Sequence, residues 1–136
     1  MAISYSEATR LAIGKALMGG DVWTPPASYD LGLFTGDPNN GGVECTGTGY
    51  ARIPLANDGT HWGVVAGSFS KTFRNLTDWV FTAAAGAGWG QPNWICLFEA
   101  GGSDKVWAFQ IDNASPVGAG DPFKVNTGGV TFQFLN

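Results

Sequence analysis

The sequence predicts an all-β fold, an eight-stranded antiparallel β-sandwich of the jelly-roll type with one short N-terminal helix. Eight short stretches have the composition of strands, and Gly, Pro, Asn and Asp stand at the breaks between them. Glycine supplies 21 of the 136 residues, about twice its average share, which favours frequent turns. Strands do not alternate with helical segments, as a parallel sheet would require. This pattern is typical of two antiparallel sheets packed face to face.

The first predicted element is a helix over residues 6–18. Ser6 is suited to the N-cap, and Glu7 lies in the first turn, where its charge favours the helix dipole. Gly19-Gly20 marks the end of the helix, and Pro25-Pro26 belongs to a rigid linker that cannot continue it. The apolar residues do not gather on one face, so we expect contacts on more than one side of the helix.

The strands follow this segment. Tyr29, Leu31 and Leu33 alternate with Asp30 and Gly32, the period of two that a half-buried strand shows. The eight predicted strands are Tyr29–Thr35, Gly49–Leu55, Trp62–Phe69, Asp78–Thr82, Asn93–Glu99, Lys105–Asp112, Pro122–Val125 and Val130–Leu135.

The chain is therefore divided into two parts. Residues 1–27 form the N-terminal helix and Pro-rich linker, and residues 28–136 form a single β-sandwich domain.

Composition argues against nucleic acid and membranes as partners. Seven basic and eleven acidic residues give a net charge of -4, so a cationic surface for phosphates or anionic lipid is not expected. No apolar run approaches the roughly 20 residues that span a bilayer. Residues 1–20 do not follow the layout of a secretory signal, and we expect a soluble protein made in the cytoplasm.

Few residues could support catalysis or metal binding. His61 is the one histidine, and we interpret it as a strand-end residue rather than a base. Cys45 and Cys96, even with His61, are too few for a closed zinc site; we expect free thiols, although facing strands could pair them. Glu44 and Glu99 could face one another, but eleven carboxylates offer such pairs by chance. We assign no catalytic, cofactor-binding or metal residue, and we expect neither an enzyme nor a cofactor.

The six tryptophans are more informative. Trp94 and Trp107 lie within predicted strands, where core packing is expected. Trp23, Trp62 and Trp89 border Pro- or Gly-rich turns, and aromatic residues in loops suit an assembly interface or a sugar-binding platform. The alternative is that each of the three caps an open end of the sandwich.

Several motifs resemble one family. They are Tyr29–Pro38, Val43-Glu44, Gly47–Arg52, Trp89-Gly90, Leu97–Glu99, Gly120–Phe123 and Gly129–Phe134. On these motifs the chain resembles small virion proteins of tailed bacteriophages that are labelled tail-fibre-like or capsid cement proteins. It is similar in particular to the capsid cement (decoration) protein of Bordetella-type podophages.

The resemblance implies a jelly roll that sits as a homodimer on the capsid exterior of the virion, after synthesis in the bacterial cytoplasm. The implied partner is the major capsid protein, and the implied role is to stabilise the icosahedral shell by bridging capsomers. The alternative is a tail-fibre-type module that binds receptor glycans through Trp23, Trp62 or Trp89. The resemblance carries no catalytic residue onto this sequence.

Overall fold

Ten β-strands and one α-helix form the regular structure of the computed structural model, which describes residues 3–65, 71–82, 86, 88–112 and 114–134. In chain order they are β1 (Ile3–Tyr5), α1 (Glu7–Met18), β2 (Ser28–Phe34), β3 (Ile53–Ala56), β4 (Trp62–Val65), β5 (Lys71–Asn75), β6 (Trp79–Phe81), β7 (Trp94–Glu99), β8 (Lys105–Gln110), β9 (Phe123–Val125) and β10 (Thr131–Phe134).

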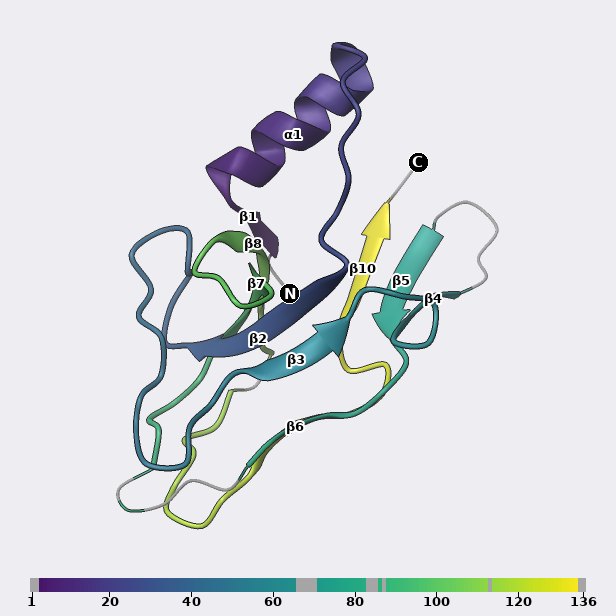
Figure 1. Cartoon of the computed structure of the whole chain (residues 1–136). Helices are drawn as coiled ribbons and strands as arrows, with labels where there is room; N and C mark the ends of the chain where they lie inside the picture. The colour runs from purple at the N-terminus through teal and green to yellow at the C-terminus, as the bar shows by residue number, and fades with distance from the viewer. Residues whose placement is uncertain (1–2, 66–70, 83–85, 87, 113, 135–136) are drawn as a thin grey trace.

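All strand pairs in these elements are antiparallel. Five strands form the main sheet in the order β1-β8-β7-β2-β3, three form a second sheet in the order β10-β5-β4, and β6 pairs with β9 (Figure 1). The predicted all-β sandwich with a short N-terminal helix is confirmed.

The structure contains two strands beyond the eight predicted. β1 is only three residues long, too short to show a period of two, and β5 has a single aromatic residue, Phe73, among polar ones. The predicted strand Gly49–Leu55 begins only at Ile53. Residues 66–69 of the predicted Trp62–Phe69 and residue 135 of Val130–Leu135 lie outside the described residues.

The main sheet is apolar on both faces, as the register between β2 and β7 explains. Leu31 pairs with Leu97 and Gly32 with Cys96, so successive pairs point to opposite faces. Leu31 and Leu97 belong to the larger core cluster, which Trp79 of β6 joins. The opposite face carries a smaller cluster of Phe34, Trp94, Cys96, Phe98 and Ala108.

The helix has the predicted caps. The Ser6 side chain accepts a hydrogen bond from the Thr9 backbone N–H at 3.1 Å, and the Gly19 N–H donates to the Lys15 carbonyl at 2.7 Å. Thr9 is the one buried residue of α1, and the helix projects from the sheets (Figure 1). The scattered apolar residues predicted contacts on more than one side, but Leu11, Leu17 and Met18 are exposed among the described residues.

The predicted N-terminal segment, residues 1–27, also contributes to the main sheet. β1 lies within this segment and extends the sheet by pairing Ile3 with Phe109 and Tyr5 with Trp107. Cys45 and Cys96 are free and buried. None of the described helical residues forms a stretch long and apolar enough to cross a membrane.

Candidate functional site

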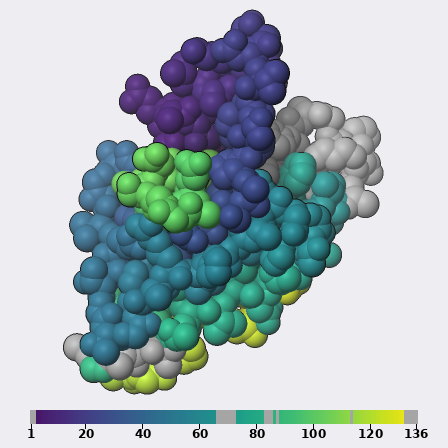
Figure 2. Space-filling model, viewed as in Figure 1, coloured from purple at the N-terminus to yellow at the C-terminus, as the bar shows by residue number. Residues whose placement is uncertain are grey.

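The most exposed apolar surface of the structure lies on a projecting arm, which we define as residues 6–27. The arm consists of α1 and of the linker that runs back beside it to β2, and it stands out from the body (Figure 2). At its tip Leu17 is 77% exposed, Met18 90% and Val22 93%. Large apolar side chains this exposed are costly to keep in water, so the tip has the character of a contact surface.

An aromatic groove lies at the base of the arm, with a volume of about 620 Å³. It is lined by residues of β1, the arm, β2, β4 and β8, among them Tyr5, Trp23, Tyr29, Trp62, Val64 and Trp107. We call this the arm groove.

Two tryptophans form its wall and connect it to the core. The rings of Trp62 and Trp107 lie 5.6 Å apart between centroids, and Trp62 meets the buried Trp79 edge to face at 5.5 Å. Trp107 in turn meets Phe109 edge to face at 4.9 Å. Because packing on the core side fixes both rings, the groove is preformed.

Polar groups at the rim hold the linker in place. The Asn57 side-chain amide donates to the Pro26 carbonyl at 2.9 Å and to the Tyr29 hydroxyl at 3.3 Å, and the Asn57 backbone N–H donates to the Ala27 carbonyl at 2.9 Å. Asp58 is hydrogen-bonded to the His61 ring at 2.7 Å, which lowers the pKa of its carboxyl. These groups are engaged with the protein, so the groove offers mainly apolar contact.

The structure brings two of the three candidate tryptophans together. Trp23, 36% exposed, and Trp62 both line the arm groove. Trp89 lies elsewhere and is only 3% exposed; its indole N–H donates to the Thr48 carbonyl at 3.2 Å, and its ring meets Tyr50 edge to face. Trp89 therefore has the alternative role, packing in the core, and presents no surface to a partner. Sequence reasoning assigned Trp107 to the core and missed its place in the groove.

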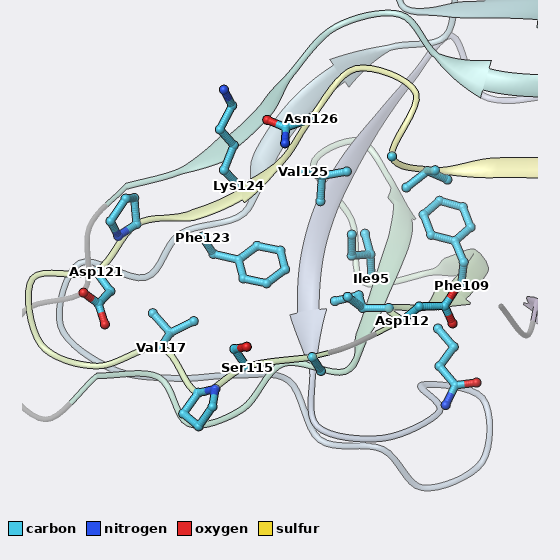
Figure 3. A pocket seen from close by; sticks show the side chains of 17 residues that line it. Ile95, Phe109, Asp112, Ser115, Val117, Asp121, Phe123, Lys124, Val125 and Asn126 are labelled. Carbon is cyan, nitrogen blue, oxygen red and sulfur yellow. The ribbon is translucent and has the colours of Figure 1, made fainter.

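A second hollow of about 640 Å³ lies between the end of β8, the loop that follows it, and β9 (Figure 3). Phe123 projects into it between Val117 and Ile95, with Asp121 and Asp112 on opposite sides. The Asp121 carboxylate accepts a hydrogen bond from the Gly118 N–H at 3.1 Å. Sequence reasoning missed this hollow because its polar residues stand in turns, where Asp normally caps the backbone.

Three residues of the family-like motifs, Glu44, Arg52 and Phe98, meet in a different place, on the outer face of the main sheet. The Arg52 guanidinium binds the Glu44 carboxylate with N–O distances of 2.8 and 2.7 Å and lies over the Phe98 ring. The Glu44 carboxylate is thus ion-paired with Arg52, whereas Glu99 is exposed at the end of β7. Glu44, Arg52 and Phe98 are thus engaged with one another on this face.

The remaining candidates for chemistry are dispersed. His61 pairs with the exposed Asp58. Burial raises the pKa of the Cys45 thiol to about 11 and that of Cys96 to about 12. Over the part of the chain that the structure describes, no three His, Cys, Asp or Glu residues are grouped so that they could hold a metal ion.

The sequence matches the model of a known family. The model of the family described as "Podophage GP4 fiber I protein gp80" matches residues 4–133, nearly the whole chain. No curated protein matches the sequence.

Proposed function

The chain belongs to the podophage GP4 fiber I protein gp80 family and is thus a phage virion structural protein of fibre-like type; from this premise we propose that it decorates the exterior of the icosahedral capsid. In this role it binds the major capsid protein as a homodimer and stabilises the shell by bridging neighbouring capsomers. The proposal needs no enzymatic activity, cofactor, nucleic acid or membrane.

The arm is the observation that carries this proposal. A helix of 12 residues is marginal in water on its own, and α1 leaves Leu17 and Met18 almost fully exposed. Such a segment is expected to be covered in an assembly, because burial of its apolar side chains stabilises the associated state. The arm therefore supports a protein that acts by associating with other proteins.

Repetition explains how a small protein can stabilise a shell. A modest contact per copy favours the assembled state by mass action, and the effect multiplies over the symmetric positions of the capsid. A homodimer suits the twofold positions of a shell, since an isologous interface uses the same patch on both copies.

A fibre-type receptor-binding module is the second candidate, and two observations favour it. The matching family is described as a fibre protein, and the second hollow combines the Phe123 ring with Asp112, Asp121 and Ser115. An aromatic face with nearby polar groups can take a sugar ring and its hydroxyls. The arm groove, with its engaged rim, is the poorer sugar site of the two.

The deciding experiment counts copies of this chain per purified virion against the major capsid protein by quantitative mass spectrometry. A copy number comparable with that of the capsid protein supports decoration of the shell. A handful of copies overturns that proposal and favours a tail or vertex fibre.

Capsids provide an independent test. Particles made without this protein are expected to disrupt at lower temperature, and added purified protein is expected to co-sediment with them and restore the higher temperature. Protein that stays wholly in the supernatant contradicts decoration.

The receptor-binding candidate is tested by binding to a panel of host-surface glycans. A Ser115→Arg variant, which fills the second hollow from an exposed loop position, is expected to lose binding, whereas Thr46→Arg on an exposed loop outside the hollow is the matched control. No binding by the wild-type protein leaves this candidate without support.

A further inference from the structure

The exposed large apolar side chains of the described residues are concentrated in one region. Only Val43 and Val80 stand apart from the N-terminal segment and the arm groove. The others are Ile3, Leu11, Leu17, Met18, Val22 and Trp23 in the N-terminal segment, and Val64 in the groove. A monomer rarely gathers its exposed apolar surface in this way unless that surface meets a partner.

Two apolar surfaces belong to this region, the tip of the arm and the arm groove. The tip carries Leu17, Met18 and Val22, and the base carries the arm groove with Trp62 and Val64. Ile13 of α1 and Trp23 of the linker also line the groove, so it reaches along the arm toward the tip. Leu17, Met18 and Val22 are nevertheless 77%, 90% and 93% exposed, so they do not occupy the groove of their own chain.

We propose that two copies of this chain pair their arms antiparallel about a twofold axis, with the tip of each arm in the arm groove of the other copy. Antiparallel pairing places each tip beside the base of the second arm, so one isologous contact covers both tips and both grooves. Met18 is suited to such a groove because its flexible thioether fits irregular space and makes favourable contacts with aromatic rings.

Charge and size favour a second copy over other occupants. Asp58, which is 51% exposed on its side chain, is the one charged residue among those that line the groove. Lys15, near the tip, makes an exposed contact of 4.0 Å with Asp21, and antiparallel arms bring it toward the carboxylate at the rim of the second copy's groove. The arm, residues 6–27, is comparable with the roughly 20–30 residues that each side of a standard interface contributes.

The inference rests on the proposed function for the homodimer and adds the surface that forms it. The test uses purified protein without capsids, so the two can fail separately. A dimer that does not bind capsids leaves the arm pairing intact and contradicts decoration. A protein that binds capsids but is a monomer in solution contradicts the arm pairing and leaves decoration of the capsid supported.

Cysteine cross-linking tests the pairing directly. A Met18→Cys, Val64→Cys variant is expected to give a disulfide-linked dimer on oxidation, because a disulfide forms only where the two Cα atoms come within about 7 Å. The native Cys45 and Cys96 are buried and do not compete. In the matched control, Met18→Cys with Val80→Cys, the second cysteine is exposed but outside the groove, and no dimer is expected. Absence of the first product, or equal linkage in the control, overturns the proposal.

Sedimentation of the unlinked protein provides the second measurement. The wild-type chain is expected to be a dimer, and a Leu17→Glu, Met18→Glu variant to weaken dimerisation at least about 30-fold, the effect of losing an interface hot spot. Val80→Glu is the control and is expected to remain dimeric. Both altered side chains are exposed in the single chain, so we expect the tip variant to fold normally. An unchanged far-UV circular dichroism spectrum verifies that it does. A monomeric wild type, or a dimer unaffected by the tip variant, overturns the proposal.

Discussion

Arg52 and Glu44 form a bidentate ion pair, with 2.8 Å between Nε and Oε1 and 2.7 Å between Nη2 and Oε2. The guanidinium lies 3.4 Å from the centroid of the Phe98 ring on the outer face of the main sheet. The Tyr50 hydroxyl donates to the same carboxylate at 2.8 Å and accepts from the Leu33 N–H of β2 at 2.9 Å. The network therefore fastens the segment between β2 and β3 onto the sheet.

Replacement of Arg52 tests how much this fastening contributes. Arg52→Lys keeps the charge but loses the planar fork and the stacking on Phe98, so we expect the free energy of unfolding to fall by about 1–3 kcal/mol in urea denaturation. Arg74→Lys is the matched control, because Arg74 is exposed on β5 and its replacement should change the free energy of unfolding by less than about 0.5 kcal/mol. Equal stability of Arg52→Lys and wild type would show that the pair does not fasten the segment.

The same network makes stability dependent on pH in the acid range. Burial alone would raise the pKa of Glu44, but hydrogen bonds from Arg52 and Tyr50 and the charge of Arg52 outweigh it, so the pKa lies below its ordinary 4.5. A carboxyl whose pKa is lower in the folded state stabilises the fold above its unfolded pKa, and this stabilisation is lost as the pH falls through the folded value.

Asp78 acts in the same direction, since hydrogen bonds from Lys124 and Thr127 lower its pKa to about 2. We expect the unfolding free energy to decline as the pH falls from about 4.5 toward 2. In Glu44→Gln, which cannot titrate at this position, the decline should be shallower and the difference from wild type should shrink toward low pH. Parallel pH profiles of the two proteins would contradict this assignment.

Gly32 of β2 tests the close packing beneath the ion pair. A Cβ at this position would lie 2.9 Å from Glu44 Oε1 and 2.9 Å from the Phe98 ring. We expect Gly32→Ala to lower the unfolding free energy by about 1–3 kcal/mol, the usual cost of overpacking. At Gly59 a Cβ meets no atom within 4 Å, so Gly59→Ala is the matched control and should be neutral or slightly stabilising. An unchanged free energy of unfolding in Gly32→Ala would mean that the Glu44 and Phe98 side chains can shift to accept the added methyl group without loss of stability.

Local signals explain which parts of the fold could be predicted. The helix carries its own caps in Ser6 and Gly19, and β2 carries an alternating apolar pattern, so neighbouring residues define both elements. β1 pairs with β8, and β5 pairs with β10 as well as with its sequence neighbour β4, so both elements depend on a strand that lies far away in sequence. A three-residue strand such as β1 has no periodicity to detect.

The candidate site follows the same division. Trp23, Trp62 and Trp89 were all predicted as interface candidates because each lies beside a Pro- or Gly-rich turn. Two of them line the groove and Trp89 is buried, because the local sequence does not reveal which side of the turn faces the core. Trp107 lies within a strand and was predicted to pack in the core, yet it is only partly buried and also lines the groove. The Glu44–Arg52 pair crosses a turn, and its geometry depends on the β2–β3 connection rather than on a spacing rule.

Asn75, at the end of β5, is expected to be one of the most sensitive positions in the chain. Its side chain is fully buried; the amide donates to the carbonyls of Thr77 and Asn126, and its oxygen accepts from the Val130 N–H, each at 2.9 Å. The side chain thus connects β5 to the turn that leads into β10. Asn75→Ala leaves the buried Val130 N–H without this partner, at about 1–3 kcal/mol, and also removes two part-buried hydrogen bonds, to the carbonyls of Thr77 and Asn126.

We therefore expect Asn75→Ala to lower the unfolding free energy by roughly 3 kcal/mol or more and to accelerate hydrogen exchange at the Val130 amide. Asn39→Ala is the matched control: the Asn39 side chain makes one exposed hydrogen bond, to Ser4 at 2.9 Å, so its loss should cost less than about 1 kcal/mol. A small effect at Asn75 together with unchanged exchange at Val130 would show that the turn is held by its backbone hydrogen bonds, such as that from Gly128 N–H to the Asn75 carbonyl. In that case the Asn75 side chain would contribute only its volume to the packing, because loss of its hydrogen bond to the Val130 N–H would not have opened that amide to exchange.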